Sequence, residues 1–458
     1  MSGFGPRGDG ERLARCFRSY EHTNAEGSCS FCWECPVQGE MKIPSPIFRA
    51  TSTRRKTMRR WFFRSAIVGV ALALVLGFIA GYAGAADEVK WGVLIDLSGP
   101  TSDWGKTQTK GQLDAARWIN ENGGINGKKL ELVVIDDAYN VPKGVAGYNR
   151  LIESEKVLGV YIQSTGTTLT LAKKIAEDKI TTFGASFTSK FQDPSKFPYS
   201  FFVGPSYGTM GRVALKWIKD NWKDTSRKPK ICYLYPDNQY GRDILDACNL
   251  YAKTLGIEVV TDQVVNWPTK DATVQLTNMK RTDPDFAYLT STAMNGAVIL
   301  KNAKALGLRT KFISNIRNFE ETLITLSGGA AEGSYGVDPF APYGADVPGM
   351  KKVVECHEKW HAGEVGTNVY VEGWVNILVA AEALRMADKA GKLVPEGIRE
   401  ALEQFKNFDT GGLAPPLTYT STDHQGSMAA KVYEVKGGKM VDVSGWIDLP
   451  REQEYFGK

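Results

Sequence analysis

Short apolar runs alternate with amphipathic stretches along the chain from residue 86 onward. Residues 89–97 have the length and composition of a buried strand and end at the turn Ser98-Gly99-Pro100. A helical stretch follows, stops at Asn122-Gly123-Gly124, and leads into a second apolar run at residues 130–135. This order predicts a βαβ unit of a parallel sheet, the kind of sheet that binds ligands beyond the carboxyl ends of its strands.

The same alternation predicts two α/β series. The first has strands at residues 89–97, 130–135, 157–162 and 180–183 and helices at 105–120, 142–153 and 168–177. The second has strands at residues 231–235, 257–265, 286–289, 311–314 and 333–337 and helices at 241–255, 272–281 and 295–306. Helices at residues 347–362, 370–390 and 395–404 and short strands at 417–419, 431–435 and 441–447 complete the pattern.

Three segments rich in turn-forming residues separate these blocks, at residues 196–205, 338–342 and 411–416. We interpret them as crossings between two domains. The first lobe then covers residues 86–205 and the second lobe residues 206–337, while residues 338–416 return to the first lobe and residues 417–458 to the second. The expected fold class is α/β, with two doubly wound parallel-sheet domains joined by a three-segment hinge around a cleft.

Residues 58–85 have the pattern of a bacterial export signal. A basic stretch that contains Arg59 and Arg60 precedes an uncharged apolar run at residues 66–82, and Ala83-Gly84-Ala85 fits a small-x-small cleavage site. We therefore expect a periplasmic protein whose mature chain begins near Ala86. The paired arginines leave twin-arginine export open, and the apolar run is just long enough for an uncleaved anchor.

Residues 1–57 precede this signal, and we interpret them as a leader that results from a start codon placed too early. They contain a CxxCxxC motif at Cys29, Cys32 and Cys35, a spacing that can also bind zinc or an iron–sulfur cluster. The mature part keeps three further cysteines, which could form one disulfide or remain buried thiols. These are Cys232, Cys248 and Cys356.

Length and charge narrow the possible functions. With 458 residues the chain is long enough for two domains of ordinary size. Residues 1–85 carry 12 Lys and Arg against 6 Asp and Glu, so the net charge of +5 for the whole chain leaves −1 on residues 86–458. A near-neutral body without a basic stripe argues against nucleic-acid binding.

One motif raises the possibility of an enzyme. Residues 357–361 read HEKWH, which matches the HExxH signature of zinc enzymes. That signature needs a third ligand and an active-site cleft, whereas this segment lies in the helical part that returns to the first lobe. We therefore expect no catalytic residue, no metal and no cofactor, and keep a zinc enzyme only as an alternative.

Five short segments together carry a resemblance to a known family. They are residues 92–100 (GVLIDLSGP), 122–127 (NGGING), 136–140 (DDAYN), 235–241 (YPDNQYG) and 284–286 (PDF). From Glu88 to Ile447 the chain resembles the periplasmic leucine/isoleucine/valine-binding proteins, the type I solute-binding proteins of ABC transporters. The resemblance implies a Venus-flytrap fold, a small ligand in the cleft and a membrane permease as partner, with the binding protein a monomer that meets the membrane only through the permease. A tethered or regulatory ligand sensor of the same fold is the alternative.

The resemblance also implies where the ligand binds. Its carboxylate would be held in the first lobe by a segment between a strand and a helix and by a second segment after the next strand. These residues are Ser164, Thr165, Gly166 and Thr167, followed by Gly184, Ala185 and Ser186. A helix N-terminus supports this role because its free N–H groups and its dipole attract anions, although Thr167 or Thr168 could simply cap the helix.

Three aromatic residues complete the implied pocket. Trp104 would close over the ligand, Tyr240 would reach in from the second domain, with Asn238 or Gln239 as alternatives, and Tyr370 would form a wall. For Trp104, the alternative role is packing in the core.

Asn295 departs from the pattern of the family. Amino-acid binders of the family are expected to carry an acid here that pairs with the ligand's α-ammonium, and residues 291–296 (STAMNG) contain none. Losing one partner of a buried ion pair costs about 3–5 kcal/mol, or roughly two to three decades of affinity. Either Asp237 or Glu320 substitutes, or the ligand is not an α-amino acid. Arg317 could pair with a second anionic group, but we interpret it as a solvated surface residue.

The sequence therefore predicts a periplasmic solute-binding protein that delivers a small ligand to an ABC importer. The ligand is expected to be a branched-chain amino acid or a related apolar or aromatic carboxylate or amide. Within that range, the missing acid favours a ligand without an ammonium group.

Overall fold

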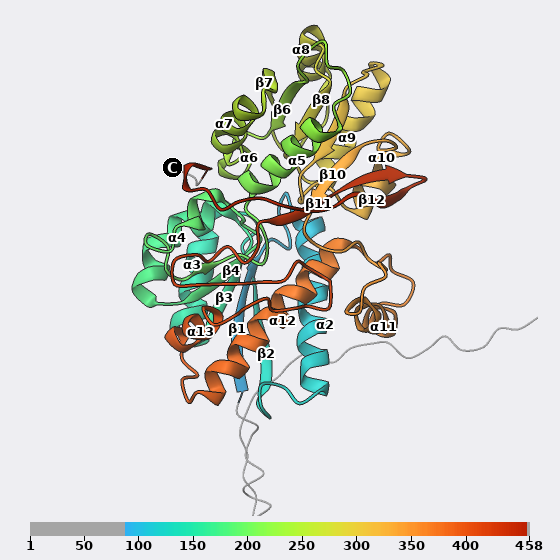
Figure 1. Ribbon diagram of the computed structural model, residues 1–458. Coiled ribbons are helices and arrows are strands. Elements are labelled where there is room, and N and C mark those ends of the chain that lie inside the picture. Colours follow the sequence, from blue (N-terminus) through green and yellow to red (C-terminus); the bar gives the residue numbers. More distant parts are fainter. Residues whose placement is uncertain (1–87, 456–458) are drawn as a thin grey trace, which may run out of the picture. The chain divides into compact units, whose positions relative to one another are not determined.

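The structure is a computed structural model that describes residues 88–455 and arranges them as two α/β lobes (Figure 1). One sheet has five strands and the other has seven. The predicted fold class, with two mostly parallel sheets covered by helices, is confirmed. The leader at residues 1–57, with its CxxCxxC motif, and the export signal at residues 58–85 lie outside the described residues.

The first sheet has the order β2-β1-β3-β4-β5, and every neighbouring pair of strands is parallel. Its strands are β1 (Glu88–Ile95), β2 (Lys129–Asp136), β3 (Gly159–Ile162), β4 (Thr181–Gly184) and β5 (Ser200–Phe201). The helices of this part of the chain are α2 (Ser102–Glu121), α3 (Val141–Glu153), α4 (Thr165–Asp178) and the 3-10 helix η1 (Ser189–Gln192). Three helices from later in the chain join them: α11 (Met350–Trp360), α12 (Asn368–Lys389) and α13 (Pro395–Leu402).

From Trp91 to Ile95, β1 carries no polar side chain, because both of its faces are covered there. Successive side chains of a strand point to opposite faces. Leu94 packs with Tyr148 and Leu151 of α3, whereas Val93 and Ile95 belong to the core on the side of α2 and α12. This two-sided burial explains why the strand reads as a continuous apolar run rather than an alternating one.

α12 lies along α2 (Figure 1), and glycine allows their backbones to come close. A Cβ at Gly111 would lie 2.1 Å from the carbonyl oxygen of Tyr370, and a Cβ at Gly373 would lie 2.3 Å from that of Gln108. Any larger residue at either position would therefore push the two helices apart.

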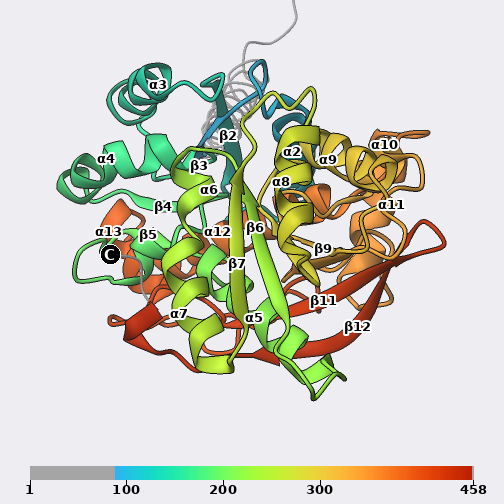
Figure 2. The ribbon, with the colours of Figure 1, turned by 90° about the horizontal axis from the view of Figure 1, so that it is seen from above.

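The second sheet has the order β12-β11-β10-β9-β8-β6-β7, in which only the β10–β11 and β11–β12 pairs are antiparallel. Its strands are β6 (Lys230–Tyr235), β7 (Glu258–Val264), β8 (Phe286–Leu289), β9 (Lys311–Ser314), β10 (Tyr335–Asp338), β11 (Ala429–Lys436) and β12 (Lys439–Asp448). Its helices are α5 (Tyr207–Asn221), α6 (Gln239–Arg242), α7 (Leu245–Leu255), α8 (Thr273–Thr282), α9 (Ala293–Ala305), α10 (Glu321–Ser327) and the 3-10 helix η2 (Gln453–Tyr455). Residues of α5 and α7 pack on one face of this sheet and residues of α8 and α9 on the other. Figure 2 shows α7 to the left of β7 and α8 and α9 to the right.

The elements differ from the prediction in several places. α10 and the short strand β5 are not among the predicted elements, and the helix predicted at residues 241–255 is divided into α6 and α7. The strand predicted at residues 417–419 is wrong, because Leu417 forms only an isolated antiparallel bridge with Phe408. α5 is not among the predicted elements. Its first three turns are buried almost all round, so they lack the polar face by which a helix is recognised in a sequence.

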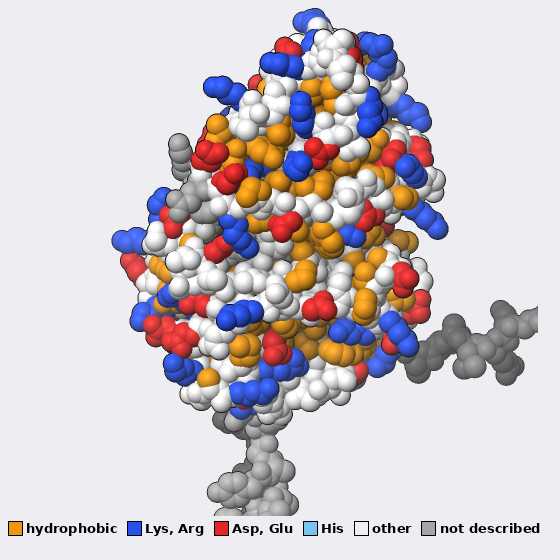
Figure 3. Space-filling model, viewed as in Figure 1, with side chains coloured by type: hydrophobic (Ala, Val, Ile, Leu, Met, Phe, Trp, Pro, Cys, Tyr) orange, Lys and Arg blue, Asp and Glu red, His pale blue; other side chains and the backbone are white. Residues whose placement is uncertain are grey.

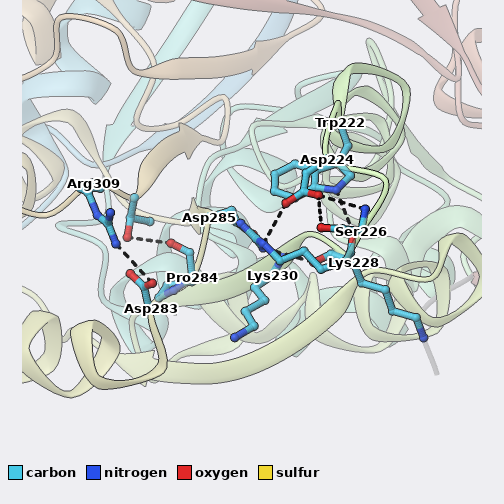
Figure 4. Close-up of polar contacts among 11 residues, drawn as sticks. Trp222, Asp224, Ser226, Lys228, Lys230, Asp283, Pro284, Asp285 and Arg309 are labelled. Carbon is cyan, nitrogen blue, oxygen red and sulfur yellow. Dashed lines mark hydrogen bonds and ion pairs between the residues drawn. The ribbon is translucent and has the colours of Figure 1, made fainter.

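The segment at residues 284–286, one of the five that carry the family resemblance, has a structural role at the amino ends of β6 and β8. These are the ends of the strands away from the site described below. The guanidinium of Arg227 donates two hydrogen bonds of 2.7 Å to the Asp285 carboxylate, which also accepts from the Lys230 N–H at 2.9 Å (Figure 4). Asp285 therefore fixes the loop that enters β6. The side chain of Asp283, two residues earlier, makes one exposed contact of 3.4 Å, to Arg309.

The three cysteines of the described residues are buried free thiols, which agrees with the second interpretation of the sequence. Over the face shown in Figure 3, Lys and Arg side chains are interspersed with Asp and Glu. Between residues 88 and 455, no helix is long and apolar enough to cross a membrane.

We predict that Asp285→Asn destabilises the protein by about 1–2 kcal/mol, because the Arg227 guanidinium and the Lys230 N–H lose a charged acceptor. Asp283→Asn is the matched control, and its effect should stay within about 0.5 kcal/mol because its ion pair is exposed. Urea unfolding followed by circular dichroism measures both. Equal effects of the two substitutions would contradict the role assigned to Asp285.

Candidate functional site

The loops that follow the parallel strands of both lobes converge on one cavity. In the first lobe, residues that follow β1, β2, β3 and β4 line the cavity. In the second lobe, it is lined by residues at the start of α5 and by residues that follow β6, β7, β8 and β9. They are Thr101, Trp104, Tyr139, Gln163, Thr165, Ala185, Tyr207, Tyr240, Trp267, Thr292 and Arg317. This is where ligands bind in doubly wound sheets.

The cavity is small, at about 30 Å³. That is space for about two water molecules. A ligand the size of an amino acid can therefore enter only if the lobes separate or the lining side chains move.

Aromatic rings from both lobes form most of the wall. The ring centroids of Tyr139 and Trp267 are 6.3 Å apart, those of Tyr240 and Trp267 are 5.6 Å apart, and those of Tyr207 and Tyr240 are 5.2 Å apart. Tyr139 belongs to the first lobe and the other three to the second. Such a wall suits an apolar or aromatic ligand body.

The backbone of Tyr139 is held in an unusual conformation. Ala138 and Tyr139 have φ values of 50° and 53°, in the left-handed region that side chains disfavour. Asp136 accepts from the Ala138 N–H and Asp137 from the Tyr139 N–H, both at 2.9 Å. Gly99 is needed opposite this turn, since a Cβ there would lie 2.4 Å from the Ala138 carbonyl oxygen.

Among the described residues that line this cavity, Arg317 alone is charged, and it is buried. Its guanidinium donates to the Glu372 carboxylate at 2.5 Å and to the Ala185 carbonyl at 2.8 Å. Its centre lies 4.7 Å from the ring centroid of Trp104 and 5.0 Å from that of Phe187. Burial alone would lower the pKa of the Arg317 guanidinium, but the neighbouring Glu372 carboxylate raises this pKa above its usual value. The interpretation of Arg317 as a solvated surface residue is wrong.

The predicted carboxylate-binding segments lie side by side in the first lobe. Ser164 caps α4 by accepting from the Thr167 N–H at 3.2 Å, and the Ser186 hydroxyl donates to the Thr165 hydroxyl at 2.9 Å. Thr165 and Ala185 line the cavity, whereas Ser164, Gly166, Gly184 and Ser186 stand beside them without lining it. Thr167 faces the other way, against Gly144 of α3.

The remaining predicted residues divide between the cavity and the core. Trp104 and Tyr240 line the cavity, and the Tyr240 hydroxyl donates to the Ser291 carbonyl at 2.8 Å. Tyr370 lies in the packing between α2 and α12, where its hydroxyl donates to Asp114 at 2.9 Å. It therefore does not contribute to the wall of the cavity.

Asn295 supports the cavity from behind. Its side chain accepts from the Thr269 N–H and donates to the Thr292 hydroxyl, both at 2.7 Å, and it does not line the cavity itself. The two proposed substitutes for an acid do not line it either. Asp237 is half exposed and pairs with Arg242, and Glu320 is buried at the start of α10. The lining, as formed by residues 88–455, is thus without a carboxylate.

Several lining residues are missing from the prediction, although a simple rule identifies most of them. Gln163, Trp267, Thr292 and Arg317 each come one to three residues after the end of a strand. Extending the strand-end rule to both lobes would have found them. Tyr207 could not be found in this way, because α5 was not predicted.

The HExxH motif does not form a metal site. His357 is buried, and the His361 Nε2 lies 2.6 Å from Asp114 on α2. Among residues 88–455, no group of three or more His, Cys, Asp and Glu side chains is placed to hold a metal ion.

Two lobes with aligned strand ends around a shared, aromatic-walled cavity define a two-lobed solute-binding protein. Residues 88–439 match the family model for periplasmic binding proteins, and the chain belongs to this family. The family consists of substrate-binding proteins rather than enzymes.

Relatives of this chain include proteins that are named for binding amino acids. The leucine-, isoleucine-, valine-, threonine- and alanine-binding protein of Pseudomonas aeruginosa is 28% identical over 342 residues, which cover 74% of this chain and 88% of that protein. The leucine-specific-binding protein of Salmonella typhimurium is 27% identical over 290 residues, 63% of this chain and 74% of that one.

Solved structures show the same fold. A branched-chain amino acid ABC transporter protein from Thermus thermophilus, with bound valine, superimposes with a TM-score of 0.74 at 25% identity, covering 81% of this chain and 97% of that one. A fatty acid ABC transporter substrate-binding protein from Thermomonospora curvata matches in fold, with a TM-score of 0.73 at 22% identity over 81% and 94% of the two chains.

The turn at residues 136–139 generates a prediction on pH. Burial raises the pKa of Asp137 to about 6. Between pH ~4 and 6 the carboxyl therefore holds a proton in the folded protein and releases it when the protein unfolds. Its contribution to stability is full below pH ~4 and is lost as the pH rises through about 6. The effect of Asp137→Asn on the free energy of unfolding should therefore be more favourable at pH 7 than at pH 4. The two effects should differ by about 2 kcal/mol at most.

Asp136→Asn is the control with the opposite sign. Burial alone would raise the pKa of Asp136, but hydrogen bonds from the Ser98 hydroxyl and from backbone N–H groups lower this pKa. Its contribution is present above pH ~4 and is lost as the pH falls, so Asp136→Asn should cost stability at pH 7 and little at pH 3. Thermal melts of both variants from pH 3 to 8 measure this. The same sign for both would refute the account of the turn.

Proposed function

We propose that this protein is a periplasmic carrier that delivers a small carboxylate to an ABC importer, and that the ligand has an apolar or aromatic body and no ammonium group. The observation that carries the ligand class is the charge of the cavity lining, which contains Arg317 and no acid. The periplasmic location is supported by the family and by the export signal predicted at residues 58–85. The permease as partner is supported by the ABC transporters to which its relatives belong.

The first lobe offers a place for the carboxylate. Thr165 is the first residue of α4, where backbone N–H groups lack helical partners and the helix dipole is positive. The adjoining Ser186 hydroxyl is within hydrogen-bond distance of Thr165. Together they can bind an anion.

The ammonium group of an amino acid would have no acidic partner in the lining. Asn295, at the position where an acid is expected, bonds to Thr269 and Thr292 instead. A buried cation left without its partner costs about 3–5 kcal/mol, which is roughly two to three decades of affinity. The aromatic wall supplies the rest of the binding energy, since burial of a leucine-sized group contributes about 1.5–3 kcal/mol.

Binding and transport are then linked by the movement of the lobes. The ligand contacts residues of both lobes, so it favours the form in which they are together. The permease is expected to recognise that form.

A branched-chain amino acid is the second candidate for the ligand, and the names of the relatives favour it. In that case a group outside the lining, such as Glu372 behind Arg317, would have to turn and meet the ammonium.

Calorimetry with matched pairs of ligands separates the two candidates. The pairs are leucine with 4-methylpentanoate and phenylalanine with 3-phenylpropanoate, which differ only in the amino group. We expect at least one deaminated acid to bind about 100-fold more tightly than its amino acid. The corresponding amides, 4-methylpentanamide and 3-phenylpropanamide, serve as a control for the carboxylate. Tight binding of leucine, isoleucine or valine would overturn the proposed ligand class.

A further inference from the structure

Arg317 follows β9 in the second lobe, yet its strongest contacts are in the first lobe. Glu372 lies on α12, which packs along α2, and Ala185 follows β4. The distances from the guanidinium are 2.5 Å to the Glu372 carboxylate and 2.8 Å to the Ala185 carbonyl oxygen. The Trp104 and Phe187 rings on which it rests also come from residues before α5.

These contacts place a cation beside the carboxylate site of the first lobe. Ala185 precedes Ser186, whose hydroxyl bonds to that of Thr165. The Ala185 carbonyl also accepts from the Tyr207 hydroxyl at 2.5 Å. An anion held by Thr165 and Ser186 would therefore lie next to the guanidinium of Arg317.

Two groups here have hydrogen-bonding capacity to spare. A guanidinium has five N–H donors, and three of those of Arg317 are accounted for, including a long contact of 3.5 Å to Tyr207. The indole N–H of Trp104 is buried in the cavity wall and has no acceptor among the described residues. Buried donors are normally satisfied, so both point to an acceptor-rich ligand group.

We propose that Arg317 is a ligand-binding residue, which clamps the ligand's carboxylate against Thr165 and Ser186 when the lobes come together. Glu372 and the Ala185 carbonyl hold the guanidinium until the carboxylate replaces one of them. This inference rests on the proposed function and adds the residue that would bind the ligand's carboxylate.

The clamp explains how amino acids are excluded. The ammonium of an α-amino acid is attached to the carbon next to the carboxylate, so it would lie close to the guanidinium, and like charges at that distance repel each other. Glu372 competes with the ligand for Arg317. Both residues therefore set selectivity, in opposite directions.

Three variants test the proposal by calorimetry with 4-methylpentanoate, 3-phenylpropanoate and leucine as probes. Glu372→Gln removes the competing carboxylate and should tighten binding of the acids about ten-fold. The double variant Arg317→Gln/Glu372→Gln, which avoids leaving either charge buried alone, should bind them about ten- to 100-fold more weakly than Glu372→Gln. Arg309→Gln removes an exposed arginine of the same lobe and should change nothing.

The ratio of affinities for 4-methylpentanoate and leucine separates binding from general damage. It should fall in the double variant and rise in Glu372→Gln. An unchanged ratio in both would overturn the role of Arg317 while leaving the proposed function intact. If the wild-type protein binds leucine but neither acid, both proposals fail. If circular dichroism shows that the double variant does not fold, Glu372→Gln alone tests the role of Arg317. Unchanged or weaker binding of the acids by Glu372→Gln would then overturn that role.

Discussion

Parallel strands bring their carboxyl ends to one edge of a sheet, and both lobes of this protein direct that edge at the same cavity. Residues after β1 to β4 and after β6 to β9 therefore meet although they are far apart in the sequence. The rest of the chain keeps this arrangement in place. α12 returns to the first lobe and packs on α2 through Gly111 and Gly373. At the opposite ends of β6 and β8, the ion pair between Asp285 and Arg227 fixes the loop that enters β6.

Within this frame, the charge of the cavity decides what it can bind. Arg317 brings the only charge in the lining, and its ion pair with Glu372 joins the lobes in a buried setting. A buried ion pair contributes little net stability, because desolvation offsets most of the attraction. Its value here lies in selectivity, since a ligand carboxylate can replace the contacts of the guanidinium and an ammonium cannot.

The sequence was sufficient to predict the architecture, because strand and helix periods are strong when both faces of a sheet are covered. It failed at α5, whose buried turns show no polar face, and at residues 417–419, where an apolar run forms only a single bridge. Of the site residues that the family resemblance implied, Trp104, Thr165, Ala185 and Tyr240 line the cavity. Arg317 also follows a strand, but its burial depends on Glu372, 55 residues later, and this is why it was interpreted as a solvated surface residue. Tyr370 shows the reverse error, in which an aromatic residue of a helix belongs to the core.

The most direct test of the account is to identify what the protein carries. The protein, exported and purified from the periplasm under native conditions, would be weighed intact by native mass spectrometry, and any bound molecule would then be released by denaturation. Its mass and its reaction with an amine-specific reagent would be determined. The account predicts an organic acid that does not react with the reagent. A released α-amino acid would contradict it.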